Sequence, residues 1–219
     1  MNSGAVLKVK VWLTGISPMI WRRVLVPATI TLRELHGVFQ VVMGWDGVHL
    51  FQFRLRGSAY GSAELGAAVP DVMLADLRLR EGARFAYEYD LNIPWLHEVR
   101  IEARMAPSPG KELPTCIDGN GACPPEDCGG PEGFMAGLDG AGSLDALEDM
   151  DAMVEILRAV VLEGHCEMLQ DDETRWRLER AVDRSKARER ARGRPFSRQE
   201  VNARLHKGEH RDLMHQQLW

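Results

Sequence analysis

The sequence predicts an α+β fold: a mostly antiparallel sheet with one packed N-terminal helix, a Cys-rich loop and a helical C-terminal region. Three observations support this prediction. Apolar and polar residues alternate with period two in several short segments of the first half. These segments follow one another without the regular strand–helix alternation of a parallel sheet. Helical periodicity takes over from Leu144.

The first predicted elements are two strands followed by a helix. Residues 6–13 alternate strictly, and residues 20–26 form a second strand-like run. Thr31, followed three residues later by Glu34, is a capping-box signature. The helix ends at Gly44. Its apolar face consists of Leu32, Leu35, Val38, Phe39 and Val42.

More strands are predicted in the middle of the chain. Residues 50–56 alternate, and residues 69–79 have no clear pattern. The alternating runs 85–89 and 99–102 are separated by a short loop at 92–94, which predicts a hairpin.

The second half is predicted to be helical. Apolar residues recur at helical spacing from Leu144, a second helix covers Asp171 to Arg192, and a short one covers Ser197 to Leu205. We therefore predict an α+β domain at 1–135 and a helical C-terminal extension at 136–219.

The net charge is −5, but the charges are unevenly placed. Between Arg175 and Arg211 thirteen Lys/Arg stand against five Asp/Glu, which defines a basic C-terminal arm. No apolar run is long enough to predict a membrane span, and the N-terminus does not resemble a signal peptide. A cytoplasmic location is expected, where cysteines serve as metal ligands or free thiols before they form disulfides.

Several motifs occur in a fixed order over about residues 6–135. They are Ile20-Trp21-Arg22-Arg23-Val24-Leu25-Val26-Pro27, Met43-Gly44-Trp45-Asp46, Tyr89-Asp90, Trp95-Leu96-His97-Glu98-Val99 and Gly121-Ala122-Cys123-Pro124-Pro125-Glu126-Asp127-Cys128-Gly129-Gly130-Pro131. This ordered set resembles the plasmid pRiA4b ORF-3-like family. The family is uncharacterised, and the resemblance implies a setting on plasmids and near mobile elements.

The chain departs from the family pattern in two places. Where similar members read Tyr-Asp-Phe-Gly-Asp, this chain continues from Tyr89-Asp90 with Leu-Asn-Ile-Pro, and the helices between about 140 and 195 look longer than in the family. Some members are labelled resolvases. A tyrosine recombinase needs a tyrosine after its His-x-x-Arg motif, but the last tyrosine here, Tyr89, precedes His97. Ser17 lacks the surroundings of a serine recombinase nucleophile, so we exclude a covalent resolvase mechanism.

A metal site is the first chemical hypothesis. Residues 107–133 form a long Pro/Gly-rich loop that needs something to hold it. Thiolate and imidazole are ligands that zinc prefers. The predicted ligands are Cys116, Cys123, Cys128 and His97, with Cys166 as an alternative fourth ligand. Two alternatives stay open: buried thiols in a rigid turn, or redox sensing by a Cys123–Cys128 pair.

A second hypothesis is a metal-dependent hydrolase or nuclease. Its candidate catalytic residues are His49, Asp90, His97 and Glu98, since a histidine flanked by carboxylates can act as a general base or a metal centre. Hydrogen-bonded structural histidines near strand ends are the alternative. The P-loop, nucleophile-elbow, zincin and dinucleotide-binding motifs are absent.

Arginines supply the remaining candidates. Arg177, Arg180, Arg184 and Arg188 fall near one helix face and could contact nucleic-acid backbone, or form an ordinary solvated face. Trp21, Arg22 and Arg23 could hold phosphate or carboxylate, and on a strand Trp21 and Arg23 share one face while Arg22 lies on the other. We interpret Arg22 and Arg23 instead as an outward pair on a solvated face. The leading hypothesis is a non-enzymatic module that binds a protein or nucleic acid, with its Cys loop fixed by zinc or by thiol pairing.

Overall fold

The chain divides into two compact units in a computed structural model that describes residues 4–141 and 143–215. The first unit combines the stretch up to Pro131 with the stretch from Arg194 onward, and the second runs from Glu132 to Gly193. This division differs from the predicted one at 1–135 and 136–219, because the last part of the chain returns to the first unit. The predicted basic arm is therefore shared between the two units.

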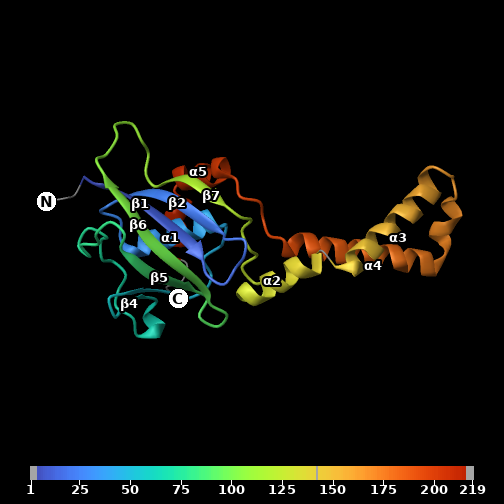
Figure 1. Ribbon diagram of the computed structural model, residues 1–219, viewed down its shortest axis with the longest axis horizontal. Coiled ribbons are helices and arrows are strands. Elements are labelled where there is room, and N and C mark those ends of the chain that lie inside the picture. The colour runs from blue at the N-terminus through green and yellow to red at the C-terminus, as the bar shows by residue number, and fades with distance from the viewer. Residues whose placement is uncertain (1–3, 142, 216–219) are drawn as a thin grey trace. The chain divides into compact units, whose positions relative to one another are not determined.

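The first unit is built on one antiparallel sheet (Figure 1). Its strand order is β4-β3-β5-β6-β1-β2-β7, and every neighbouring pair is antiparallel. The strands are β1 (Val6–Leu13), β2 (Trp21–Pro27), β3 (Phe51–Leu55), β4 (Ser58–Gly61), β5 (Arg84–Tyr89), β6 (Trp95–Met105) and β7 (Thr115–Asn120). The α+β prediction is confirmed, including the β5–β6 hairpin.

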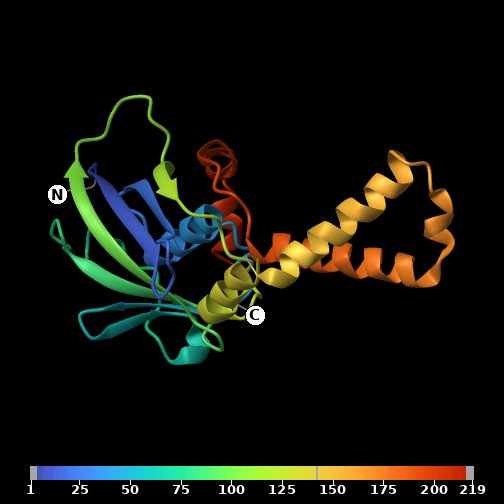
Figure 2. The same ribbon diagram turned by 45° about the vertical axis from the view of Figure 1, so that its right-hand side comes forward.

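Helix α1 (Leu32–Met43) lies against one face of this sheet (Figures 1 and 2). It begins with the predicted capping box, in which the Glu34 backbone N–H donates to the Thr31 hydroxyl and the Thr31 backbone N–H donates to the Glu34 carboxylate. It ends at Gly44 in the left-handed conformation. Almost every residue of α1 is buried, because the sheet covers one side and α5 (Arg198–His206) and α6 (Glu209–Leu213) contact it elsewhere.

The core between α1 and the sheet is aromatic. Phe39 of α1 packs edge-on against Tyr87 with ring centroids 5.2 Å apart, and Tyr87 lies 4.7 Å from Phe53. Next to them the Trp45 ring stacks on Tyr89 at 5.2 Å. These rings are almost fully buried, so they fix the positions of the turns that follow β5 and α1.

Two predicted irregular regions contain structure. The loop at 107–133 includes β7, which pairs with β2, and it ends in the first turn of α2 (Gly130–Ala141). Residues 69–79, which follow the short 3₁₀ helix η1 (Ala63–Leu65) in the sequence, form turns. Their carbonyl groups at Pro70 and Val72 accept hydrogen bonds from the first N–H groups of α1. These turns therefore help to cap α1.

The second unit is helical. After α2 it contains α3 (Leu144–Val161), the short 3₁₀ helix η2 (Cys166–Gln170) and α4 (Asp172–Ala191), and α3 packs against α4 as a helical hairpin. Asp149 of α3 is fully buried there and is bound by Arg184 and Arg188 of α4. Burial alone would raise the pKa of Asp149, but the two guanidinium groups outweigh it and hold that pKa below its usual range.

Candidate functional site

The Pro124–Cys128 loop lies where several of the recognised motifs meet. The Trp45 indole N–H donates to the Pro124 carbonyl at 3.0 Å, and the Trp95 indole N–H donates to the Glu126 carbonyl at 3.1 Å. Both indole rings are almost fully buried. Two tryptophans from separate parts of the chain thus fix the loop backbone, which explains how a Pro-rich segment without periodicity is held.

The Glu126 side chain adds a second attachment. Its carboxylate accepts a hydrogen bond from the Tyr89 hydroxyl and another, at 2.9 Å, from the Asp46 backbone N–H. Burial, followed by the bond to Glu126, raises the pKa of Tyr89 above its usual value, so this hydroxyl stays protonated and donates. Glu126 was not among the predicted site residues. Its position inside the most distinctive motif was the available signal.

His49 joins the same loop to the β5–β6 turn. Its Nε2 lies 3.1 Å from Asp127 Oδ1, and its Nδ1 lies 4.0 Å from Asp90 Oδ1. Asp90 also accepts from the backbone N–H groups of Asn92 and Ile93, at 3.1 and 3.4 Å. The His49 imidazole thus lies between two carboxylates. Here the contacts also brace two turns against each other.

The four predicted catalytic residues do not form one site. His97 points into the aromatic core, where its ring lies 5.0 Å from Tyr87 and its Nδ1 lies 2.8 Å from the Trp95 carbonyl. Burial lowers the pKa of His97 to about 3, which keeps it neutral. Glu98 follows His97 on β6, so it projects to the opposite face, and it pairs with Arg84 at 2.7 Å. Only His49 and Asp90 are neighbours.

The predicted metal ligands are also separated. Within residues 4–141 and 143–215 no group of three or more His, Cys, Asp or Glu side chains is placed to hold a metal ion. The Cys116 thiol contacts the Asp118 carbonyl at 3.4 Å, the Cys128 thiol contacts the Gly130 carbonyl at 3.8 Å, and the exposed Cys166 belongs to the helical unit. The residues present do not fit the predicted zinc site, because Cys116, Cys123, Cys128 and His97 form no such group and the His97 Nδ1 lies at the Trp95 carbonyl.

Cys123 is buried beside Arg22. Burial raises the pKa of the Cys123 thiol to about 12, although the positive charge of Arg22 acts in the opposite direction. A thiol of this kind reacts slowly, since the thiolate is the nucleophile. In this structure all four cysteines are free, so thiol pairing is not what holds the loop.

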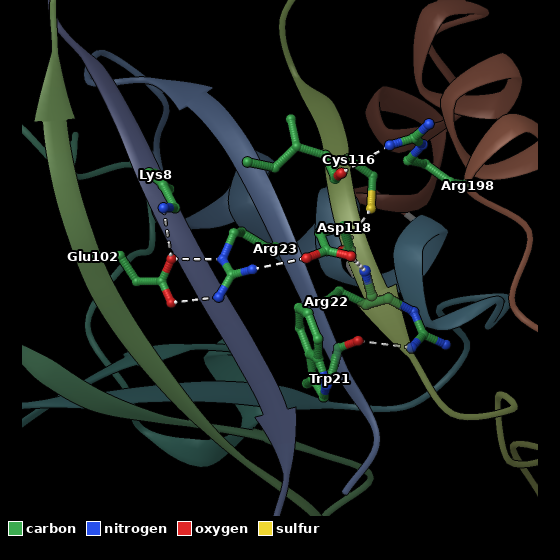
Figure 3. A network of polar contacts seen from close by, with 10 residues as sticks. Lys8, Trp21, Arg22, Arg23, Glu102, Cys116, Asp118 and Arg198 are labelled. Atoms are coloured by element: carbon green, nitrogen blue, oxygen red, sulfur yellow. Dashed lines mark hydrogen bonds and ion pairs between the residues drawn. The ribbon is translucent and has the colours of Figure 1, made fainter.

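The prediction that Arg22 faces solvent is wrong. Arg22 is fully buried, and Figure 3 shows its side chain extending away from that of Arg23. Its guanidinium donates at 2.8 to 3.0 Å to four backbone carbonyls, those of Trp21, Val42, Asn120 and Gly121. Arg23 projects to the other face, where it binds Glu102 at 2.7 Å and Asp118 at 2.9 Å. Arg22 thereby joins β2, the end of α1 and the end of β7.

The four arginines predicted to contact nucleic acid are engaged within the helical unit. Arg184 and Arg188 bind the buried Asp149, and Arg177 lies 3.9 Å from Glu155. The Arg180 guanidinium lies 4.6 Å from the centre of the Trp176 ring. Arg184 and Arg188 therefore hold the hairpin together, whereas Arg177 and Arg180 are the two of the four predicted arginines that do not bind Asp149.

The outward face of α3 is the most distinctive surface of the helical unit. Five apolar side chains lie along it, each more than half exposed: Leu147, Met150, Val154, Leu157 and Val161. The residues of α3 that are buried, Asp149, Ile156 and Ala159, lie on a different face. We call the five exposed residues the α3 stripe. No helix in the described part of the chain is both long and apolar enough to cross a membrane.

Together, the sheet, the covering helix α1 and the clamped Cys-Pro loop define an α+β core that carries a helical hairpin. The chain belongs to the plasmid pRiA4b ORF-3-like family, whose model matches residues 5–163. The match thus extends beyond the predicted 6–135 and includes α3. The predicted family membership is confirmed.

Two relatives are informative. The chain is 41% identical over 137 residues to the uncharacterized protein y4hQ of Sinorhizobium fredii (strain NBRC 101917 / NGR234). The aligned region covers 60% of this chain and 70% of that protein. It is also similar to the crystal structure of MM3350, a protein of unknown function from Methanosarcina mazei Go1. The TM-score is 0.61 at 31% identity, and the match covers 64% of this chain and 83% of that one. Neither description names an activity.

Proposed function

We propose that this chain is a non-enzymatic interaction module that binds another protein through the α3 stripe. The observation that carries the proposal is the exposure of five apolar side chains along one helix face. Contiguous apolar surface of this kind is typical of protein–protein contact sites. An amphipathic helix in a single-chain protein normally turns its apolar face to the core.

Two further observations support a protein partner over catalysis or nucleic-acid binding. The candidate catalytic side chains are divided between the core, the turn region and the opposite sheet face. The arginines of α4 that would face phosphates are partly neutralised by Asp149 and Glu155. A binding role needs neither set of residues, whereas the α3 stripe is exposed and packs on no element of the described helical unit.

Site-specific photo-crosslinking tests the proposal. A benzophenone amino acid is placed at Leu147 in the stripe and, as a control, at Val69, which is slightly more exposed (63% against 56%) but lies in the sheet unit. In cells that express the full chain, we expect discrete protein adducts at Leu147 that are absent at Val69. The absence of adducts at Leu147, or equal adducts at both positions, contradicts the proposal.

A second measurement addresses nucleic acid directly. We expect fluorescence anisotropy at low salt to show no tight binding to a labelled DNA duplex. Binding that weakens steeply with added salt and is lost in Arg177→Ala/Arg180→Ala would replace the protein partner with nucleic acid.

A further inference from the structure

The spacing of the α3 stripe is that of a coiled-coil seam. From Leu147 the apolar residues follow at intervals of three, four, three and four, which is the a/d pattern of a heptad repeat. Their exposed fractions are 56% for Leu147, 57% for Met150, 58% for Val154, 62% for Leu157 and 65% for Val161. The seam therefore extends over about 21 Å of helix and stays exposed among the residues that the structure describes.

The hairpin does not provide that partner. The face of α3 turned toward α4 carries Ile156 and Ala159 and the Asp149 ion pairs, and Ala181 is buried on α4. These residues occupy other heptad positions than the seam. The α3 helix thus has two separate contact faces, one used in the hairpin and one free to receive a second helix.

We propose that the occupant of this seam is α3 of a second copy of the same chain, packed antiparallel about a two-fold axis. This inference rests on the proposed function and names its partner. An isologous contact requires a surface that complements itself. The apolar positions meet this requirement, since a two-fold axis near Val154 and Leu157 places Val154 of each copy against Leu157 of the other.

The charges beside the seam favour the antiparallel arrangement. Asp151 and Arg158 flank the seam on the same side, three residues before and four residues after Val154. An antiparallel copy brings Asp151 of each chain next to Arg158 of the other, which gives two opposite-charge pairs. A parallel copy would instead place these charges beside apolar positions such as Ala146 and Met153.

The free chain leaves both charges available. The Arg158 side chain is 71% exposed and contacts Glu163 at 3.2 Å, and Asp151 is exposed. Because a guanidinium has five N–H donors, Arg158 can donate to Glu163 of its own chain and to Asp151 of the second copy at the same time. One helix pair is smaller than a standard interface of about 800 Å² per partner, so we expect association at micromolar concentrations.

Sedimentation equilibrium on the full chain tests this inference. Over 1 to 200 μM we expect the mass to rise from 24.6 kDa toward twice that value. Val154→Glu/Leu157→Glu should remain monomeric with an unchanged circular dichroism spectrum, because both side chains are already exposed. The matched control is Leu162→Glu, which adds the same charge at a position that is 78% exposed but off the seam, and should still dimerise.

Charge reversal tests the orientation. Asp151→Arg and Arg158→Asp should each weaken association by about tenfold, and the double variant should restore it. A chain that is monomeric throughout, or a dimer insensitive to Val154→Glu/Leu157→Glu, overturns the inference. In that case stripe-dependent crosslinks to a protein of another mass would still uphold the proposed function, whereas no crosslinks would end both.

Discussion

The guanidinium of Arg22 stacks on the ring of Phe196, with 4.2 Å between the Arg22 Cζ and the ring centre. One residue lies in the second strand and the other follows the helical unit, so this contact joins distant parts of the chain within the first unit. Gly119 lies directly beside both side chains: a Cβ built there would be 2.8 Å from the Phe196 ring and 2.9 Å from Arg22. The packing leaves no room for a larger residue at this position.

Arg22 should be far more important to stability than its neighbour Arg23. Arg22→Lys keeps the charge but removes the planar fork that serves four carbonyls, so we expect a loss of about 3 kcal/mol in the free energy of unfolding. The matched control Arg23→Lys alters a partly exposed ion pair and should cost less than about 1 kcal/mol. Urea unfolding followed by tryptophan fluorescence measures both. Equal losses would show that the buried hydrogen bonds of Arg22 contribute little.

Gly37 marks the contact between α1 and α6. A Cβ at this position would lie 1.9 Å from the His210 carbonyl oxygen, so Gly37→Ala should displace α6 and lower the melting temperature. Gly140→Ala is the control: it is also helical, and nothing lies within 4 Å of the added atom. There the usual helix preference for alanine, about 1 kcal/mol, should leave the protein unchanged or stabilised. A Gly37→Ala protein as stable as Gly140→Ala would show that α6 is not held at α1.

Two buried histidines predict how stability depends on pH. Burial lowers the pKa of His36 and of His97 to about 3, whereas an unfolded histidine titrates near 6.5. Between these values the unfolded chain binds protons that the folded chain does not. The free energy of unfolding should therefore have its full value above pH 6.5 and decrease as the pH falls toward 3.

Urea titrations at several pH values between 4 and 7 measure this decrease. His97→Gln should make the decline shallower, because one of the buried histidines with a lowered pKa is removed. His206→Gln, which removes a partly exposed surface imidazole, serves as the control and should preserve the decline. If His97→Gln leaves the pH dependence of wild type unchanged, His97 is not held neutral in the core.

The cysteines should react with iodoacetamide in order of their exposure. Cys166 is exposed and should react first, followed by Cys128, whereas Cys116 and Cys123 are buried and should react only on unfolding. Peptide mass spectrometry gives the order, and elemental analysis of the same sample gives the zinc content. One zinc per chain, together with joint protection of Cys116, Cys123 and Cys128, would restore the metal-site hypothesis.

The parts of the fold with local signals could be predicted from the sequence. Thr31 and Glu34 interact with each other, and the period-two runs define their own strands, so neither needed knowledge of distant residues. Strand β7 could not be predicted, because Gly119 interrupts the alternation of apolar and polar residues. The strand is defined instead by its hydrogen-bonded pairing with β2, which is distant in sequence. The alternation at Arg22 and Arg23 correctly separated their two faces. It could not indicate which face the ends of α1 and β7 would cover.

The site was predictable only in part for the same reason. The motif around Glu126 was visible, but its role depends on Tyr89 and on the Asp46 backbone, which come close only in the fold. The grouping of His97 with Glu98 failed because adjacent strand residues point in opposite directions. The α3 periodicity was clear in the sequence. Whether it faces a core or solvent is decided by α4, which covers a different side of the helix.

The return of the chain to the first unit has a consequence for biosynthesis. The backbone of Arg194 pairs with Cys123, and α5 and α6 contact α1, so the sheet unit needs residues made after the whole hairpin. On the ribosome, α1 can make its contacts with α5 and α6 only after the last residues are synthesised. The hairpin is contiguous in sequence, so α3 and α4 can pack together earlier. During that interval the nascent chain exposes apolar surface, and a chaperone would have its main opportunity to bind there.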